Sequence, residues 1–136
     1  MATRKPSRLT PLESLVMDCL WELREGTVRE VKERLDQTNP RAYNTVLTVL
    51  RILRDKGFVT SERKGRADVY RPGVTRVQAS RRPLRELLDR FYAGSATALV
   101  SQLLDTADLD PEEIRAIRRE VDAKLRESAD KGSADA

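Results

Sequence analysis

Two helix-start signals close together constrain the first third of this 136-residue chain to short helices. Residues 10–13 (TPLE) place a threonine at the N-cap, a proline at the first helical position and a glutamate three residues after the cap. Residues 27–30 (TVRE) repeat the threonine and the glutamate at the same spacing. In such a capping box, each of the two side chains bonds the backbone N–H of the other residue. With Gly26 as a stop between them, these signals predict a first helix that ends just before a second one begins.

A third helix is predicted from about Arg41 to Lys56, where Gly57 provides the stop. Its apolar residues fall on one side of a helical wheel; they are Ala42, Val46, Val49, Leu50 and Leu53. The opposite side is polar; it carries Asn44, Thr48, Arg51 and Asp55, with Arg41 and Thr45 at its margin. Three short helices in this order, the third with a polar outer face, are typical of a helix-turn-helix. A solvated helix in an ordinary bundle is the alternative that this pattern leaves open.

The periodicity changes after Gly57. Residues 58–63 and 67–71 are rich in β-branched and aromatic side chains, and they flank a short turn, Lys64-Gly65-Arg66. This pattern predicts a two-stranded hairpin with a cationic tip. A hairpin directly behind such a helix is the wing of a winged helix, and its tip is expected to lie beside DNA phosphates.

The rest of the chain is predicted to be helical from Thr75 onward, with Pro83 either kinking one helix or starting a new one. Gly94 ends this part, Ser95 caps a further segment, and Asp110 caps the last helix. Because the apolar stripe of the last helix is narrow and lies between charged flanks, we expect it to pack against a second copy of the chain. The residues assigned to this dimer contact are Leu84, Leu88, Phe91, Leu99, Leu103, Ile114, Ile117, Val121 and Leu125.

These patterns divide the chain into four parts. Residues 1–9 are expected to form a flexible basic arm, 10–74 a winged-helix DNA-binding domain, 75–127 a helical dimerisation region and 128–136 a disordered tail. The expected fold class is mostly α with a small β-hairpin: a winged helix-turn-helix domain followed by a C-terminal helical dimerisation region.

Charge is distributed unevenly along the chain. Residues 1–82 carry 18 Lys and Arg against 10 Asp and Glu, whereas residues 83–136 carry 8 against 12. A basic front half followed by a mildly acidic rear half indicates that the front half meets a polyanion.

The composition excludes several classes of site. The chain has no histidine and a single cysteine, Cys19, which falls in the apolar stripe of the first helix. Histidine-based triads, histidine-containing zinc sites and disulfide frameworks are therefore excluded, and no metal or cofactor is expected. Since no acid–base pair lies beside a nucleophile or a glycine-rich loop, the chain is not expected to be an enzyme. The longest uncharged stretch, Phe91–Leu104, is too short to span a bilayer, and the N-terminus has no apolar signal segment, which predicts a cytoplasmic protein without membrane insertion.

Several segments together resemble the BlaI/MecI/CopY family of bacterial winged-helix repressors over roughly residues 9–125. The matching segments are 9–13 (LTPLE), 16–21 (VMDCLW), 42–50 (AYNTVLTVL) with Leu53, 56–59 (KGFV), 92–95 (YAGS) and 109–114 (LDPEEI). The resemblance implies a homodimeric repressor in which two winged-helix domains bind a pseudo-palindromic operator and the C-terminal helices of both chains interlock.

The resemblance also implies a means of release. In the beta-lactam members of the family, a sensor peptidase triggers cleavage in the C-terminal part, so a regulatory peptidase is an expected partner. The cleaved Asn-Phe position of those members falls near Gln102-Leu103, which departs from that pattern. The copper members sense metal through a C-terminal cysteine motif, whereas Cys19 is the only cysteine in this chain.

The predicted contacts with double-stranded DNA divide into two kinds. Asn44 and Arg51 are suited to base edges, and Thr45 and Thr48 can contact a base or a phosphate. Phosphate contacts are assigned to Arg41, Tyr43, Lys64 and Arg66. The alternative functions are a winged-helix protein-interaction module and a nonspecific DNA-binding protein.

Overall fold

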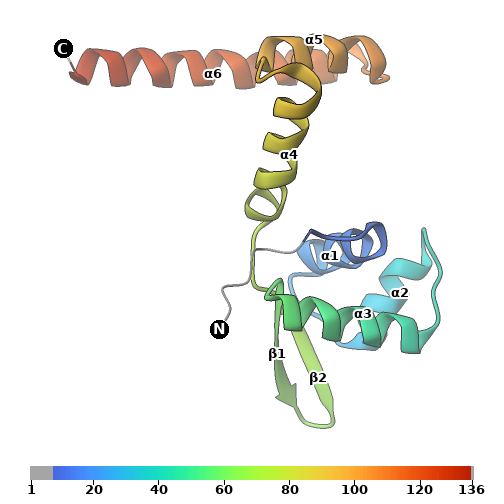
Figure 1. Cartoon of the computed structure of the whole chain (residues 1–136). Helices are drawn as coiled ribbons and strands as arrows, with labels where there is room; N and C mark the ends of the chain where they lie inside the picture. The colour runs from blue at the N-terminus through green and yellow to red at the C-terminus, as the bar shows by residue number, and fades with distance from the viewer. Residues whose placement is uncertain (1–7, 136) are drawn as a thin grey trace. The chain divides into compact units, whose positions relative to one another are not determined.

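The computed structural model describes residues 8–135 and consists of helices and one two-stranded antiparallel sheet (Figure 1). The order is α1 (Pro11–Leu23), α2 (Val28–Asp36), α3 (Tyr43–Lys56), β1 (Val59–Lys64), β2 (Ala67–Pro72), α4 (Arg76–Tyr92), α5 (Ala96–Thr106) and α6 (Pro111–Asp135). The predicted fold class is confirmed. The chain divides into two compact units whose boundary lies between Glu86 and Leu87, inside α4.

The predicted helix caps are formed. The Thr10 Oγ1 accepts from the Glu13 N–H at 3.2 Å, and the Glu13 carboxylate accepts from the Thr10 N–H at 2.8 Å. Thr27 and Glu30 repeat this capping box at 3.2 and 2.9 Å. In the C-terminal region, the side chains of Ser95 and Asp110 accept from the backbone three residues onward. These caps satisfy amides that have no partner within the helix.

The end of α1 differs from the prediction. The helix ends at Leu23, and Arg24 rather than Gly26 takes a positive φ of 74° while its N–H bonds the Leu20 carbonyl. Gly26 instead forms a β-bridge with Tyr70, in which each N–H donates to the other residue's carbonyl at 2.9 and 2.8 Å. The glycine therefore joins the connection after α1 to the hairpin.

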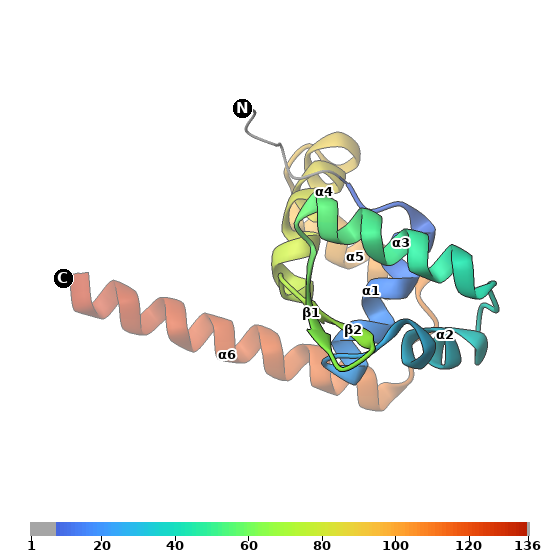
Figure 2. The same cartoon turned by 90° about the horizontal axis from the view of Figure 1, so that it is seen from below.

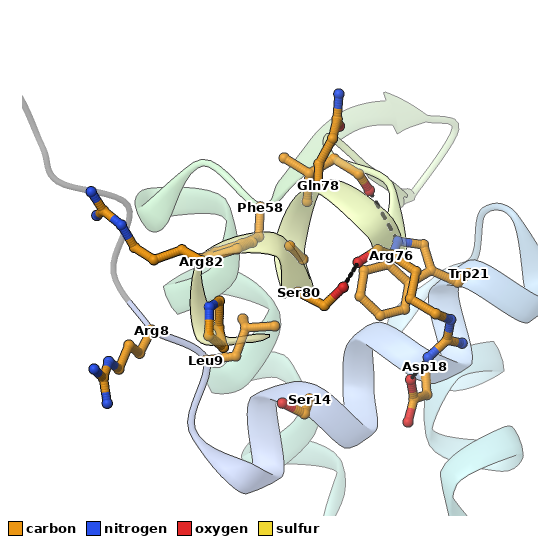
Figure 3. A pocket seen from close by; sticks show the side chains of 13 residues that line it. Arg8, Leu9, Ser14, Asp18, Trp21, Phe58, Arg76, Gln78, Ser80 and Arg82 are labelled. Atoms are coloured by element: carbon orange, nitrogen blue, oxygen red, sulfur yellow. Dashed lines mark hydrogen bonds and ion pairs between the residues drawn. The ribbon is translucent and has the colours of Figure 1, made fainter. Parts of the chain in front are cut away.

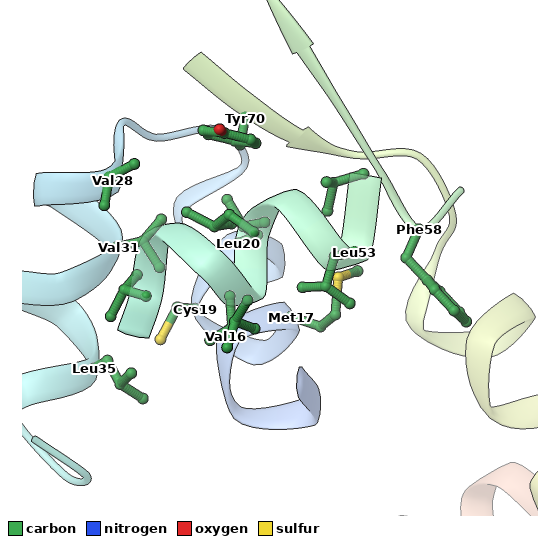
Figure 4. Close-up of a cluster of buried hydrophobic side chains, with 14 residues drawn as sticks. Val16, Met17, Cys19, Leu20, Val28, Val31, Leu35, Leu53, Phe58 and Tyr70 are labelled. Atoms are coloured by element: carbon green, nitrogen blue, oxygen red, sulfur yellow. The ribbon is translucent and has the colours of Figure 1, made fainter. Parts of the chain in front are cut away.

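The core of the first unit lies between α1, α2, α3 and the base of the hairpin (Figure 4). Its buried side chains are Val16, Met17, Cys19, Leu20, Val28, Val31, Leu35, Val46, Val49, Leu50, Leu53, Phe58, Val59 and Tyr70. Cys19 is buried as its apolar position predicts, and burial raises the pKa of its thiol. The helical-wheel prediction is wrong for Ala42, which is exposed because α3 begins at Tyr43 and leaves Ala42 at the N-cap.

The hairpin extends from the C-terminal end of α3 (Figures 1 and 2). Gly57 ends α3 in the left-handed region, with a φ of 88° that favours glycine. The strands pair in register from Val59 opposite Pro72 to Lys64 opposite Ala67, so that Gly65 and Arg66 form the turn. The cations of the predicted tip are therefore Lys64, at the end of β1, and Arg66, in the turn, with Gly65 between them.

The first turns of α4 belong to the winged-helix unit, later than the boundary expected after residue 74. The indole N–H of Trp21 donates to the Val74 carbonyl at 3.0 Å, and Arg76 pairs with Asp18 at 2.7 Å. Ala79 packs against the edge of the core. The helix then continues through Pro83 without a break, so this proline lies inside one helix and does not start a new one.

The second unit is helical but has no buried core of its own. A turn at Ala93 and Gly94, both with positive φ, separates α4 from α5, and the Tyr92 hydroxyl donates to the Gln102 side chain at 2.9 Å. Among residues 87–132, whose burial the structure describes, no side chain is buried.

At both ends of the chain the described residues differ from what the sequence predicts. The predicted disordered tail, 128–136, is wrong for residues 128–135, because α6 continues to Asp135. Residues 128–131 contain no glycine or proline that would end the helix there. Lys131 also pairs with Glu127 one turn earlier at 3.7 Å. Most of the expected arm, residues 1–7, lies outside the described residues, while Leu9 packs against the core and Arg8 pairs with Glu86.

Within residues 8–135, no helix is both long and apolar enough to cross a membrane.

Candidate nucleic-acid interface

The outer face of α3 presents most of the predicted DNA-contacting side chains to solvent. Asn44, Thr48 and Arg51 are exposed and follow one another at helical spacing, while Thr45 is half-buried beside them. Tyr43, with 46% of its surface exposed, stands at the start of the helix. The structure therefore brings the two predicted base readers, Asn44 and Arg51, onto the same side of one helix.

A buried ion pair holds the other end of α3. Glu13 on α1 is only 4% exposed, and its two carboxylate oxygens accept from the Lys56 ammonium at 2.8 and 3.0 Å. The same ammonium donates to the Arg8 carbonyl at 3.3 Å. Burial alone would raise the pKa of Glu13, but the bonds from Lys56 and Thr10 outweigh it and hold the pKa below its ordinary value. This pair fixes the last turn of α3 to the first turn of α1.

The start of α3 is held from α2. The N–H of Arg41 donates to the Asp36 carboxylate at 3.4 Å, and its guanidinium donates to the Pro40 carbonyl at 2.9 Å. Tyr43 lines a shallow hollow with Arg29 and Lys32 of α2. Arg41 and Tyr43 thus lie together at the turn between the two helices, as the phosphate-contacting assignment requires.

Lys64 and Arg66 are exposed at the tip of the hairpin. Their exposed neighbour Arg63 is engaged by an ion pair to Asp68 at 3.7 Å and by a bond to the Gly65 carbonyl. Within the described part of the chain, Arg66 forms no ion pair. The tip therefore offers two cations to an anionic partner rather than three.

The base of the hairpin is tied to the connection after α1 by a residue that sequence reasoning did not single out. Arg71 on β2 pairs with Glu25 at 2.7 Å and with Glu62 at 3.0 Å. The hydrogen bond and charge of Arg71 hold the pKa of Glu25 below its ordinary value. No local pattern predicts this contact, since it joins residues far apart in the sequence.

Arg54 was also missed. It lies on α3 one turn after Arg51, and its guanidinium donates to the Ser61 hydroxyl on β1 at 3.3 Å. Its spacing from Arg51 is the signal that could have placed it on the polar face. Its contact links α3 to the hairpin at the edge of the candidate interface.

The sequence model described as penicillinase repressor matches residues 9–123, most of the chain. The chain belongs to the penicillinase repressor family. The resemblance of the segments compared above to BlaI and MecI is thereby confirmed. The match extends from the residues before α1 into α6, so it includes parts of both units of the chain.

Individual relatives agree with this membership. The penicillinase repressor of Bacillus licheniformis is 28% identical over 111 residues, which are 82% of this chain and 87% of that protein. The transcriptional regulator BlaI of Mycobacterium tuberculosis is 46% identical over 69 residues, half of each chain. One similar solved structure is the solution structure of Bacillus licheniformis BlaI, a monomeric form in complex with the blaP half-operator. Its sequence identity to this chain is 27% and its TM-score is 0.47, and the likeness covers 55% of this chain and 92% of that one.

Proposed function

We propose that this member of the family acts as a homodimer on a pseudo-palindromic operator in double-stranded DNA. Membership of the family makes the chain a DNA-binding transcriptional repressor. The observation that carries the proposed DNA contacts is the exposed polar face of α3, with Asn44 and Arg51 on one side of the helix and the exposed cations of the hairpin tip in the same unit.

In this proposal α3 enters the major groove. The Asn44 amide can bond the N6 and N7 of adenine, and the Arg51 guanidinium can bond the O6 and N7 of guanine. Thr45 and Thr48 contact a base, a thymine methyl or a phosphate. Phosphate contacts from Arg41, Tyr43, Lys64 and Arg66 fix the position of the domain along the duplex.

Support for the homodimer comes from the second unit. Large apolar side chains that a single chain leaves in water include Phe91 at 66%, Val121 at 56% and Leu125 at 68% exposure. The other residues of the predicted contact are exposed or half-buried; they are Leu84, Leu88, Leu99, Leu103, Ile114 and Ile117. Helices with apolar stripes and no core between them need a partner to bury those stripes, and a second copy provides identical ones.

We infer further that the repressor works in the cytoplasm without a catalytic site or cofactor, and that a regulatory peptidase acting in its C-terminal region releases the operator. Gln102 and Leu103 lie within α5 and are exposed. Because a helical segment does not fit a peptidase site, this step requires α5 to open locally first.

The test is a selection of genomic fragments with the purified full chain at about 0.15 M salt, with nonspecific competitor DNA present. We expect one recovered motif with dyad symmetry. Uniform recovery of all fragments would instead support nonspecific DNA binding, and recovery of none would leave the protein-interaction module as the better function.

A further inference from the structure

The winged-helix unit contains a pocket of about 550 Å³ between α1 and the first turns of α4 (Figure 3). This volume lies within the range of sites for small molecules. The wall is mostly apolar and includes Leu9, Trp21, Phe58, Val74 and Ala79. It lies apart from α3's polar face, because no side chain of α3 lines it.

Three of the residues that line the pocket are arginines. Arg76 is committed to Asp18 at 2.7 Å and also covers the Trp21 ring, with its guanidinium carbon 4.6 Å from the ring centre. Arg8 pairs with Glu86, which is outside the lining. Arg82 lies at the rim and forms no ion pair within residues 8–135. Because Arg8 and Arg76 are each paired with a carboxylate, Arg82 is the lining arginine whose charge is left to favour an anionic ligand.

The lining also includes Gln78, whose side-chain oxygen accepts from the Thr75 N–H at 2.9 Å, and two serine hydroxyls, one from each wall. Ser14 comes from α1 and Ser80 from α4, and both lie at the pocket in Figure 3. The Ser80 hydroxyl donates to the Arg76 carbonyl at 2.8 Å, so its lone pairs remain available as acceptors. The pocket thus combines an apolar wall with a few polar groups that can orient a ligand.

We propose that this pocket binds a small organic anion, a carboxylate with an aromatic or alkyl body. The body packs against Trp21 and Phe58, and the carboxylate lies at the rim near Arg82. Such a ligand contacts α1 and the start of α4 together. It thereby fixes the first turns of the helix that joins the two units of the repressor.

Trp21 provides a direct assay because it is the only tryptophan in the chain. The full-length protein, without DNA, is titrated with phenylbutyrate while tryptophan fluorescence is recorded. We expect a saturable change in emission. The neutral analogue phenylbutyramide is expected to bind about tenfold more weakly, because it lacks the charge that the arginines favour.

Three variants locate the binding. Arg82→Ala is expected to weaken phenylbutyrate roughly 2–5-fold, as for a solvent-exposed charge contact. Arg81→Ala is the matched control, since Arg81 is exposed next to it but does not line the pocket. Ser80→Leu places a larger side chain in the pocket from an exposed helix position and is expected to abolish the saturable change. Circular dichroism confirms that each variant is folded.

Three outcomes would overturn the proposal. Equal affinity for the acid and the amide would show that the site does not select an anion, and unaltered binding by Ser80→Leu would place the ligand elsewhere. A Trp21 emission that changes with protein concentration but not with phenylbutyrate would show that a second copy covers the pocket. Because no DNA is present, each result is independent of operator binding.

Discussion

Tyr70 is fully buried, and the burial of its hydroxyl costs free energy of folding. Its side chain is 0% exposed, and within the part of the chain whose side chains are described its hydroxyl has no hydrogen-bond partner. Tyr70 is nevertheless central, because its ring packs in the core and its backbone bridges to Gly26. The ring and the backbone stabilise the domain, while the hydroxyl loses its bonds to water.

Replacing Tyr70 by phenylalanine keeps the ring and removes the unsatisfied hydroxyl. We expect Tyr70→Phe to raise the free energy of unfolding by about 1 kcal/mol, measured by urea denaturation at a fixed protein concentration. Tyr70→Ala is the control for the ring and is expected to lower it by about 3–5 kcal/mol. A loss of stability in Tyr70→Phe would show that the hydroxyl has a partner in solution.

Substitutions at Asn44 and Arg66 test the proposed division between base recognition and phosphate binding. Asn44→Ala is expected to cost about 1–3 kcal/mol on the operator and to relax preference at one base pair. Arg66→Ala should weaken all sequences alike and reduce the magnitude of the log–log salt slope by about 0.9. Binding to the operator and its single-base variants over a range of salt concentrations measures both effects.

Arg118→Ala is the control for that series, because it removes the same charge from an exposed position on α6. If Asn44→Ala weakened every sequence equally, Asn44 would be a positioning residue and the base-reading assignment would be wrong.

At the scale of the element, the ion pair of Glu13 and Lys56 makes the packing of α3 on α1 depend on pH. The folded pKa of Glu13 is lowered below its ordinary value of 4.5, so the pair stabilises the domain fully above that value. The stabilisation is lost as the pH falls through the lowered folded pKa, because the carboxylate then becomes protonated in the folded state as well.

Glu13→Gln keeps an acceptor for the Thr10 N–H and removes the charge. We expect it to lower the free energy of unfolding by about 1–2 kcal/mol at neutral pH, and we expect this difference to shrink in acid. The matched control is Glu30→Gln at the second capping box, where the glutamate is exposed. Denaturation curves at neutral and acidic pH test this, and a difference that does not change with pH would contradict the role of the ion pair.

Local signals predicted the elements well, and contacts between distant residues account for what they missed. The capping boxes, Gly57 and the change of period after it place three helices and a hairpin because each depends on neighbouring residues. The attachment of α4 through Val74 and Arg76, and the tie between Arg71 and Glu25, join residues about fifty positions apart. No periodicity reports such pairs. The polar face of α3 was predictable because exposed and buried residues recur along this one helix with the helical period.

At the scale of the whole molecule, the second unit has apolar stripes but no buried side chain among residues 87–132. The proposed dimer would bury these stripes, and it would also give the repressor two copies of α3 for two half-sites. Linking the second half-site to the first raises overall affinity by about 10²-fold or more without any new kind of contact. If the proposal is right, operator binding depends on the C-terminal helices as well as on α3.

A charge within the α6 stripe tests this dependence. Ile117 is half-buried and Val121 is 56% exposed, so aspartate at either position is tolerated by the single chain but opposes burial against a second copy. We expect Ile117→Asp and Val121→Asp to sediment as monomers and to bind the full operator about 10²-fold more weakly, with half-site binding retained. Arg119→Asp places the same residue on the charged flank of the helix and is expected to remain dimeric. If both stripe variants sedimented like the unmodified chain, the dimer contact would not include this stripe, and the uncovered side chains of α4 and α5 would be the next surface to test.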